Sequence, residues 1–224
     1  MNDAMAALVE DFYSNVLHCD QWRFSAAEHR IRCSAHILHL CCIDAFNHFE
    51  PHIKKLRNLA IFLKNSPTKM VLFSASCSNF PDCPETKPML DVCTRWNSTF
   101  DMLSRSLELR LAIDHFTDHK EFTQFKLVED EWITIKEVQV FLEIFNWVSH
   151  CLTEQNCGTL SATVPYYQKI IHYCCAHIYG PKRSSCESIT AAAVAAVTKL
   201  EKYFDKVFFV VISRSVLQIT LLLC

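Results

Sequence analysis

An arginine and a tryptophan stand side by side at residues 95 and 96, and this pair could bind nucleic acid. A guanidinium can hold a phosphate through two parallel hydrogen bonds. An indole offers a stacking face to an unpaired base. Arg95 and Trp96 are therefore candidate DNA contacts. The plainer alternative, which two adjacent residues alone favour, is a Trp96 packed in a core beside a solvated Arg95.

A second candidate is the C-x-x-H spacing of Cys33 and His36, which suits two metal ligands. A structural zinc site needs four ligands, usually from two such pairs. His39 and Cys42 follow on the next predicted helix, but no second pair follows at finger spacing. We therefore predict no metal site, and we interpret His36 as a structural or DNA-facing residue.

Other catalytic patterns are weaker. The chain has no G-x-S-x-G nucleophile motif and no glycine-rich phosphate loop. Two-metal nuclease chemistry needs several acids that converge on divalent ions, and the spacing of Asp82, Glu85 and Asp91 does not show convergence. Cys77 and Cys83 flank a proline-rich stretch with no histidine close by, so they are poor candidates for metal ligands.

The composition favours an intracellular helical protein. Half of the 224 residues are hydrophobic and only two are glycine, so turns that need positive φ must be few. The net charge of −2 provides no bulk basic field, and any DNA contact must come from a local patch. Thirteen cysteines without a visible secretory signal indicate reduced thiols.

Apolar residues that recur with a period near 3.6 predict the helices that position these candidates. The helix after the Arg-Trp pair would be capped by Thr94 or Asn97 and would run to about residue 118. Residues 65–89 hold four of the seven prolines and are predicted to be a loop or linker, and Arg30–Cys33 a short extended segment. The other predicted helices are 5–18, 36–49, 50–64 with a basic, solvated side, 129–153, 160–179 and 186–206.

The tail at 207–224 has a different character, because it is apolar and β-prone with Arg214 as its one charge. It could be a buried strand. It could be a membrane anchor, although an arginine near the middle costs roughly 2.5–3.5 kcal/mol there. It could also be a sequence that does not belong to the fold.

Two segments resemble signatures of hAT-superfamily DNA transposases. Arg32–Leu40 is similar to the family pattern R-C-x-A-H-x-L-N-L, with His39 in place of the usual asparagine. Leu90–Thr99 is similar to L-D-x-x-T-R-W-N-S-T, with Cys93 where proline is common. Weaker landmarks in the family's order are Lys55–Leu59, Ser66-Pro67, Glu131-Trp132 and Thr159–Ser161, so the resemblance covers about residues 2–206.

The resemblance implies a ribonuclease-H-like core, interrupted by a helical insertion, that cuts DNA with Mg or Mn held by three acids. Met1-Asn2-Asp3 resembles the end of the second acid's motif, and none of the three acids can be placed on a residue here. We therefore assign no catalytic residue and no cofactor to this chain. The resemblance implies that Arg95 binds a phosphate, that Trp96 stacks on a flipped base and that His36 lies near the DNA end. It implies structural roles within the motifs for Cys33, Asp91 and Asn97.

The sequence thus predicts a mainly α fold with three parts. Residues 1–118 would hold a partial ribonuclease-H-like α/β core and the start of the helical insertion, 119–206 the insertion, and 207–224 a tail of doubtful origin. The predicted function is that of a truncated transposase-like relic of a transposable element, inactive as a nuclease but retaining DNA-end binding.

We expect a nuclear location by family resemblance, and otherwise a cytoplasmic one. DNA is the predicted partner, self-association is left open, and membrane association is not expected. Two rival functions remain. The chain could be part of an active metal-dependent transposase whose acids lie elsewhere, or a helical protein-interaction module with a membrane-prone tail.

Overall fold

The computed structural model describes residues 3–15, 33–84, 86–92, 95–153, 159–180 and 186–222, which are mainly helical. The predicted mainly α class is confirmed, and no β-strand occurs in these ranges, so the predicted α/β core is not shown. The elements are α1 (Asp3–Asn15), α3 (Ser34–Phe46), α4 (Glu50–Lys64), α5 (Pro67–Cys77), α6 (Trp96–Glu108), α7 (Arg110–Thr117), η1 (Thr123–Phe125), α8 (Glu129–Thr153), α9 (Thr159–Ile178) and α10 (Glu187–Leu222).

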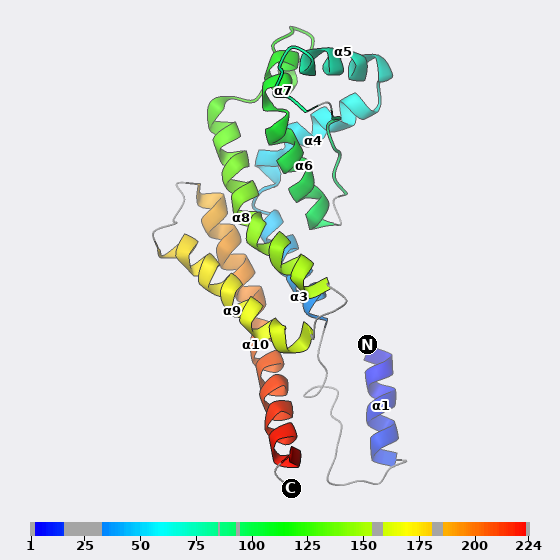
Figure 1. Ribbon diagram of the computed structural model, residues 1–224, viewed down its shortest axis with the longest axis vertical. Coiled ribbons are helices and arrows are strands. Elements are labelled where there is room, and N and C mark those ends of the chain that lie inside the picture. Colours follow the sequence, from blue (N-terminus) through cyan, green and yellow to red (C-terminus); the bar gives the residue numbers. More distant parts are fainter. Residues whose placement is uncertain are drawn as a thin grey trace.

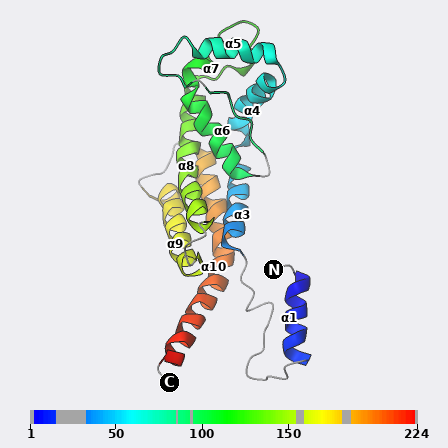
Figure 2. The same cartoon turned by 45° about the vertical axis from the view of Figure 1, so that its right-hand side comes forward.

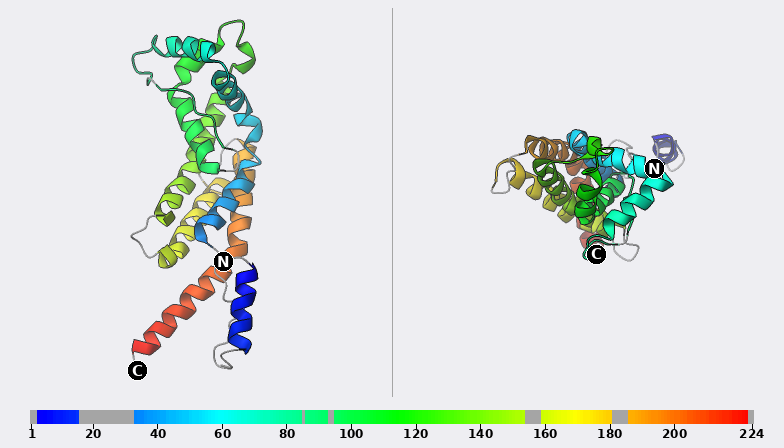
Figure 3. Two further views of the ribbon diagram at one scale, coloured as in Figure 1. Left: turned by 90° about the vertical axis from the view of Figure 1, so that its right-hand side faces the viewer. Right: turned by 90° about the horizontal axis from the view of Figure 1, so that it is seen from above.

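Four helices form an elongated bundle, in which α10 packs against α9 and α3, and α8 packs against α9 and α3 (Figure 1). At one end α4 continues from α3, and α5 crosses the top of the molecule against α7 (Figure 2). α6 packs along α8 between these two regions. α1 stands apart from the other helices (Figure 3).

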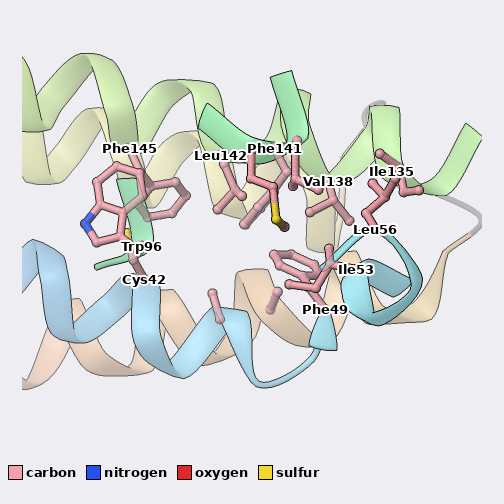
Figure 4. Packing of buried hydrophobic residues seen from close by; sticks show 14 of the residues in the cluster. Cys42, Phe49, Ile53, Leu56, Trp96, Ile135, Val138, Phe141, Leu142 and Phe145 are labelled. Carbon is pink, nitrogen blue, oxygen red and sulfur yellow. The ribbon is translucent and has the colours of Figure 1, made fainter. Parts of the chain in front are cut away.

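The core follows the predicted helical period. The apolar stripe of α8 is buried along its whole length, at Trp132, Ile135, Val138, Leu142, Phe145 and Val148. The predicted stripe of α4 is buried as well, at Ile53, Leu56, Leu59, Ala60 and Leu63. Figure 4 shows Ile53 and Leu56 of α4 beside Ile135 and Val138 of α8. Phe49 and Phe141 make an edge-to-face contact at 5.7 Å. The buried cluster extends from Ile37 to Leu200, so most of the helices share one core.

The predicted loop at 65–89 is partly wrong, because Pro67–Cys77 forms α5. Proline is tolerated at the first helical position, where its missing N–H would have no helical partner. Ser66 accepts the Lys69 N–H at 3.4 Å and caps this helix. Asn65, Ser66 and the described residues of this segment after Cys77 lack helix.

The helix predicted from the Arg-Trp pair to residue 118 is divided at Leu109 into α6 and α7. The buried stripe runs through the break in steps of three and four residues, at Thr99, Met102, Ser106, Leu109, Ile113 and Phe116. Leu111, predicted to face inward, lies off this stripe and is 56% exposed. The predicted cap is also wrong for Asn97, which lies inside the first turn, and Thr94 lies outside the described residues.

The backbone of the tail is helical, because α10 continues to Leu222, and the predicted buried strand is therefore wrong. The side chains from residue 205 onward lie outside the described residues. The other two interpretations of the tail, a membrane anchor and a sequence that does not belong to the fold, depend on these side chains and stay untested. Among the residues that the structure describes, no helix is long and apolar enough to cross a membrane. Residues 30–32 of the predicted extended segment and 16–18 of the first predicted helix also lie outside the description.

Candidate nucleic-acid interface

Asp91, in the extended segment before α6, is held by two side chains from different parts of the chain. Arg57 Nη2 donates to Asp91 Oδ2 at 2.7 Å, and Arg57 Nε donates to Oδ1 at 2.9 Å. Thr99 Oγ1 donates to the same Oδ2 at 2.8 Å. The Asp91 side chain has no exposed surface, so these bonds replace its hydration. The network ties the lead-in segment to α4 and to the first turn of α6.

The ionised form of Asp91 is favoured by this network. Burial raises the pKa of the carboxyl group, but the hydrogen bonds from Arg57 and Thr99 and the charge of Arg57 outweigh burial. The net result is a pKa below the ordinary value for aspartate. The guanidinium of Arg57 is shared with Glu50, whose Oε2 accepts from Nη1 at 2.7 Å. Asp91 is therefore committed to the fold.

Ser98 fixes the turn between Asp91 and α6. Its Oγ accepts the Val92 N–H at 2.8 Å and approaches the carbonyl oxygen of Arg95 at 2.7 Å and that of Val92 at 3.0 Å. Arg95 N–H donates to the Val92 carbonyl at 2.7 Å. A side-chain-to-backbone network of this kind closes a local turn. The Ser98 network therefore fixes the backbone position of Arg95 at the start of the helix.

Trp96 is buried, with 3% of its surface exposed. Figure 4 shows its indole at the end of the core where Cys42 of α3 and Phe145 of α8 lie. The structure therefore agrees with the interpretation of Trp96 as a tryptophan packed in the core. In this arrangement no face of the ring is open to a base, and stacking would require the indole to leave the core. The predicted DNA role of Trp96 stays untested.

Arg95 differs from Trp96 because its side chain is exposed. It occupies the N-cap position of α6, and its side chain makes no hydrogen bond or ion pair within the described ranges. The start of a helix carries a partial positive charge, which adds to that of the guanidinium. Arg95 is therefore free to bind an anion from solution.

His36 is exposed in the first turn of α3, where its ring stacks on His39 at a centroid distance of 6.3 Å. Burial and the neighbouring His36 lower the pKa of His39. Cys33 is exposed immediately before the helix and accepts the Ile37 N–H on its carbonyl. In the part of the chain that is described, no hydrogen bond or ring contact joins His36 to Arg95.

The start of α3 is anchored to α9. Tyr167 Oη donates to the Ser34 carbonyl at 3.1 Å, and the Ser34 and Thr163 hydroxyls lie 2.9 Å apart. Tyr167 is fully buried, and its burial is the main reason that its pKa is raised. The orientation of the Cys33–His36 segment therefore depends on a residue 133 positions later in the chain.

The Glu131-Trp132 landmark also has structural partners. Lys55 Nζ lies 2.7 Å from Glu131 Oε1, and Glu131 Oε2 accepts the Val128 N–H at 2.9 Å, as a helix-capping glutamate does. Burial raises the pKa of Glu131, but Lys55 and the Val128 N–H hold it below its ordinary value. Trp132 Nε1 donates to Asp114 at 2.9 Å. The Glu131 carboxylate therefore has a structural role at the start of α8.

Sequence reasoning missed the role of Arg57, which it placed on a solvated basic face. The residue is only 14% exposed and bridges Asp91 and Glu50. No local pattern predicts this pairing, because its partner lies 34 residues away. In the ranges that the structure covers, no group of three or more His, Cys, Asp or Glu side chains could hold a metal ion. Cys77 and Cys83 are free thiols.

The sequence resembles known proteins over much of its length. Residues 31–141 match the ZBED1 RNase-like helical domain. The chain is 27% identical over 88% of its length to a Zea mays protein described as an AC transposase, and this match covers 23% of that protein. It is 27% identical over 54% of its length to the zinc finger BED domain-containing protein RICESLEEPER 2 of Oryza sativa subsp. japonica, covering 17% of that protein.

A Talaromyces stipitatus protein described as the transcriptional regulator tpeD is 35% identical over 41% of the chain, which is 10% of that relative. The chain therefore spans less than a quarter of the length of each of these three relatives. No solved structure matches the chain.

Proposed function

The chain is an hAT-type transposase-like protein, and from this premise we propose that its described part binds the phosphates of DNA ends at the start of α6. One observation carries the proposal. Within the motif 90–99, the side chains of Asp91, Trp96, Ser98 and Thr99 are engaged in the fold, whereas Arg95 projects into solvent without a partner among the described residues. The surrounding contacts thus fix an arginine at a helix start, where phosphate binds well.

Electrostatics define the expected mode of binding. The whole chain carries a net charge of −2, so a sequence-independent attraction over a broad basic surface is not the basis of the proposal. A single guanidinium at a defined position contributes one or two phosphate contacts. His36 is the second proposed contact, because it is exposed at the start of α3 and can donate to a phosphate oxygen.

Fluorescence anisotropy with hairpin-ended DNA at several salt concentrations tests the Arg95 contact. Arg95→Gln should bind DNA more weakly than wild type. Its binding should release about one ion fewer, so its affinity should depend less steeply on the salt concentration. Arg105→Gln is the matched control, because Arg105 lies on the same helix in an ion pair with Glu108 at 3.1 Å. Equal losses for both variants would show a non-specific charge effect and reject the proposed contact.

We also propose that this chain binds DNA without cutting it. Support comes from the acids in its signature segments, since Asp91 and Glu131 are both held in ion pairs with basic residues of α4. In the family that the sequence resembles, Mg or Mn bound by three acids supplies the cleavage chemistry, and we assign none of those three acids to a residue of this chain. Supercoiled plasmid incubated with Mg²⁺ or Mn²⁺ should stay intact. Metal-dependent nicking that co-purifies with the chain would reject this part of the proposal.

The finer fold assignment is part of the same proposal. We propose that the described helices belong to the helical part of a ribonuclease-H-like arrangement, supported by the match of residues 31–141 to an RNase-like helical domain. That match crosses the predicted boundary between residues 118 and 119, which stays a prediction.

We propose a nuclear location, because the similar proteins include ones described as a transposase and a transcriptional regulator. Self-association also stays a prediction.

A further inference from the structure

An open pocket of about 620 Å³ lies between the end of α5 and the end of α7. Two histidines line it, His115 in the last turn of α7 and His119 just beyond that helix. Their ring centroids are 5.8 Å apart, and both side chains are exposed. Phe116 and Phe122 line the same pocket and stack face to face at 4.3 Å. The motifs that support the proposed function include none of these residues.

A hydrogen bond holds the His115 ring against α5. Ser76 Oγ lies 3.2 Å from His115 Nδ1 and also donates to the Leu72 carbonyl at 3.3 Å. With Nδ1 on Ser76, Nε2 is the ring nitrogen that can bind a metal ion. A histidine whose other nitrogen is fixed by a hydrogen bond is typical of a metal ligand.

The rest of the pocket is compatible with a cation. Phe80 packs edge-on against His115 at 5.9 Å and restricts the ring. Asp118 interacts electrostatically with both imidazoles, although its carboxylate is bound to Lys126 at 2.6 Å. Asn79 also lines the pocket. Lys120 and Glu121 line the pocket as well, and Glu121 is paired with Lys69 at 3.0 Å, so the two imidazoles are the main metal-binding groups of this pocket.

We propose that His115 and His119 form a two-histidine site for a borderline divalent ion such as Zn²⁺ or Ni²⁺. Imidazole nitrogen suits these ions, whereas Mg²⁺ and Mn²⁺ prefer oxygen ligands. Water or an incoming ligand completes the coordination. The site thus differs in ion preference from the Mg or Mn that the family resemblance implies for DNA cleavage.

Calorimetric titration of the untagged full chain with Ni²⁺ tests this site. Because the chain has 11 histidines and 13 cysteines, the comparison between variants is what matters. His115→Gln and His119→Gln should each weaken one binding event by at least about tenfold, and Ser76→Ala should weaken it by about 10–100-fold. His150→Gln is the control, since His150 is exposed on α8. Millimolar Mg²⁺ should not compete.

Unchanged Ni²⁺ affinity and stoichiometry in His119→Gln would overturn the proposal. This variant is the decisive one, because the His119 side chain is exposed and its substitution should leave the thermal unfolding midpoint unchanged. An equal loss in His150→Gln would also overturn it, since it would show binding to scattered surface histidines.

Discussion

Arg57 and Asp91 lie 34 residues apart in the chain and form a two-pronged ion pair, with Nη2 to Oδ2 at 2.7 Å and Nε to Oδ1 at 2.9 Å. The carboxylate is fully buried and the guanidinium is 14% exposed. A buried charge that loses its partner is costly, whereas the intact pair contributes mainly to specificity. The pair fixes the segment that leads into α6 and thereby the position of Arg95.

Replacing Asp91 by asparagine should lower the free energy of unfolding by about 3–5 kcal/mol, because Arg57 would keep a largely buried charge without its carboxylate. Urea denaturation measures this loss. Glu50→Gln is the control, because Glu50 is 55% exposed and its bond to Arg57 should contribute about 1 kcal/mol or less. Equal losses for the two variants would contradict a structural role for the buried pair.

The pH dependence of stability should report the same pair. The pKa of Asp91 is lower in the folded chain than its ordinary value of 3.8, so the folded state favours the ionised form. This contribution is fully present above the unfolded pKa and is lost as the pH falls through the folded pKa. In wild type, the free energy of unfolding should therefore fall below about pH 4.

Asp91→Asn removes the group that titrates, so its stability should fall less steeply over the same acid range. Denaturant titrations from pH 6 to below pH 4 measure both slopes. An identical acid loss in wild type and variant would assign the effect to other carboxyl groups, among them Glu131, whose pKa is also lowered.

Substitutions of Arg95 and Trp96 should change stability by very different amounts although the two residues are neighbours. Trp96→Ala removes a side chain that is 3% exposed and should cost about 3–5 kcal/mol. Arg95→Ala changes an exposed side chain and should stay within about 0.5 kcal/mol of wild type. Thermal unfolding followed by circular dichroism separates the two. A small loss for Trp96→Ala would show that the indole is not part of the core.

Tyr167→Phe should loosen the start of α3 while leaving the rest of the bundle folded. The variant loses the hydrogen bond to the Ser34 carbonyl at 3.1 Å, which should cost about 1 kcal/mol. Hydrogen exchange of the first amides of α3 should quicken more than exchange in α8. A uniform increase over all helices would indicate global destabilisation and contradict a local anchor.

Sequence periodicity predicted the buried stripes of α4 and α8 because a helix that packs on one side repeats its apolar residues every 3.6 positions. The same rule could have placed Trp96. Traced backward from Leu103, the stripe reaches Thr99 and then Trp96, and all three are buried. The adjacent arginine favours a binding interpretation, whereas the apolar stripe predicts the packed indole that the structure shows.

Long-range features could not be read from local sequence. The pairing of Arg57 with Asp91 depends on how α4 meets the lead-in to α6, and neither segment contains its partner. The histidine pocket likewise needs α5 beside α7, because Ser76 lies 39 residues from His115. α5 differs from the predicted loop for a local reason, since proline is a loop signal in this stretch but also suits a helix start, where Pro67 stands.

The most direct test of the account measures binding of hairpin-ended DNA by Arg95→Gln and Trp96→Phe side by side, with wild-type chain as the reference. Trp96→Phe keeps an aromatic side chain in the core, so both variants should fold. If Arg95 is the DNA contact, Arg95→Gln should weaken binding and Trp96→Phe should bind as wild type does. Weaker binding by a folded Trp96→Phe, with Arg95→Gln unchanged, would contradict it and establish the indole as the DNA contact.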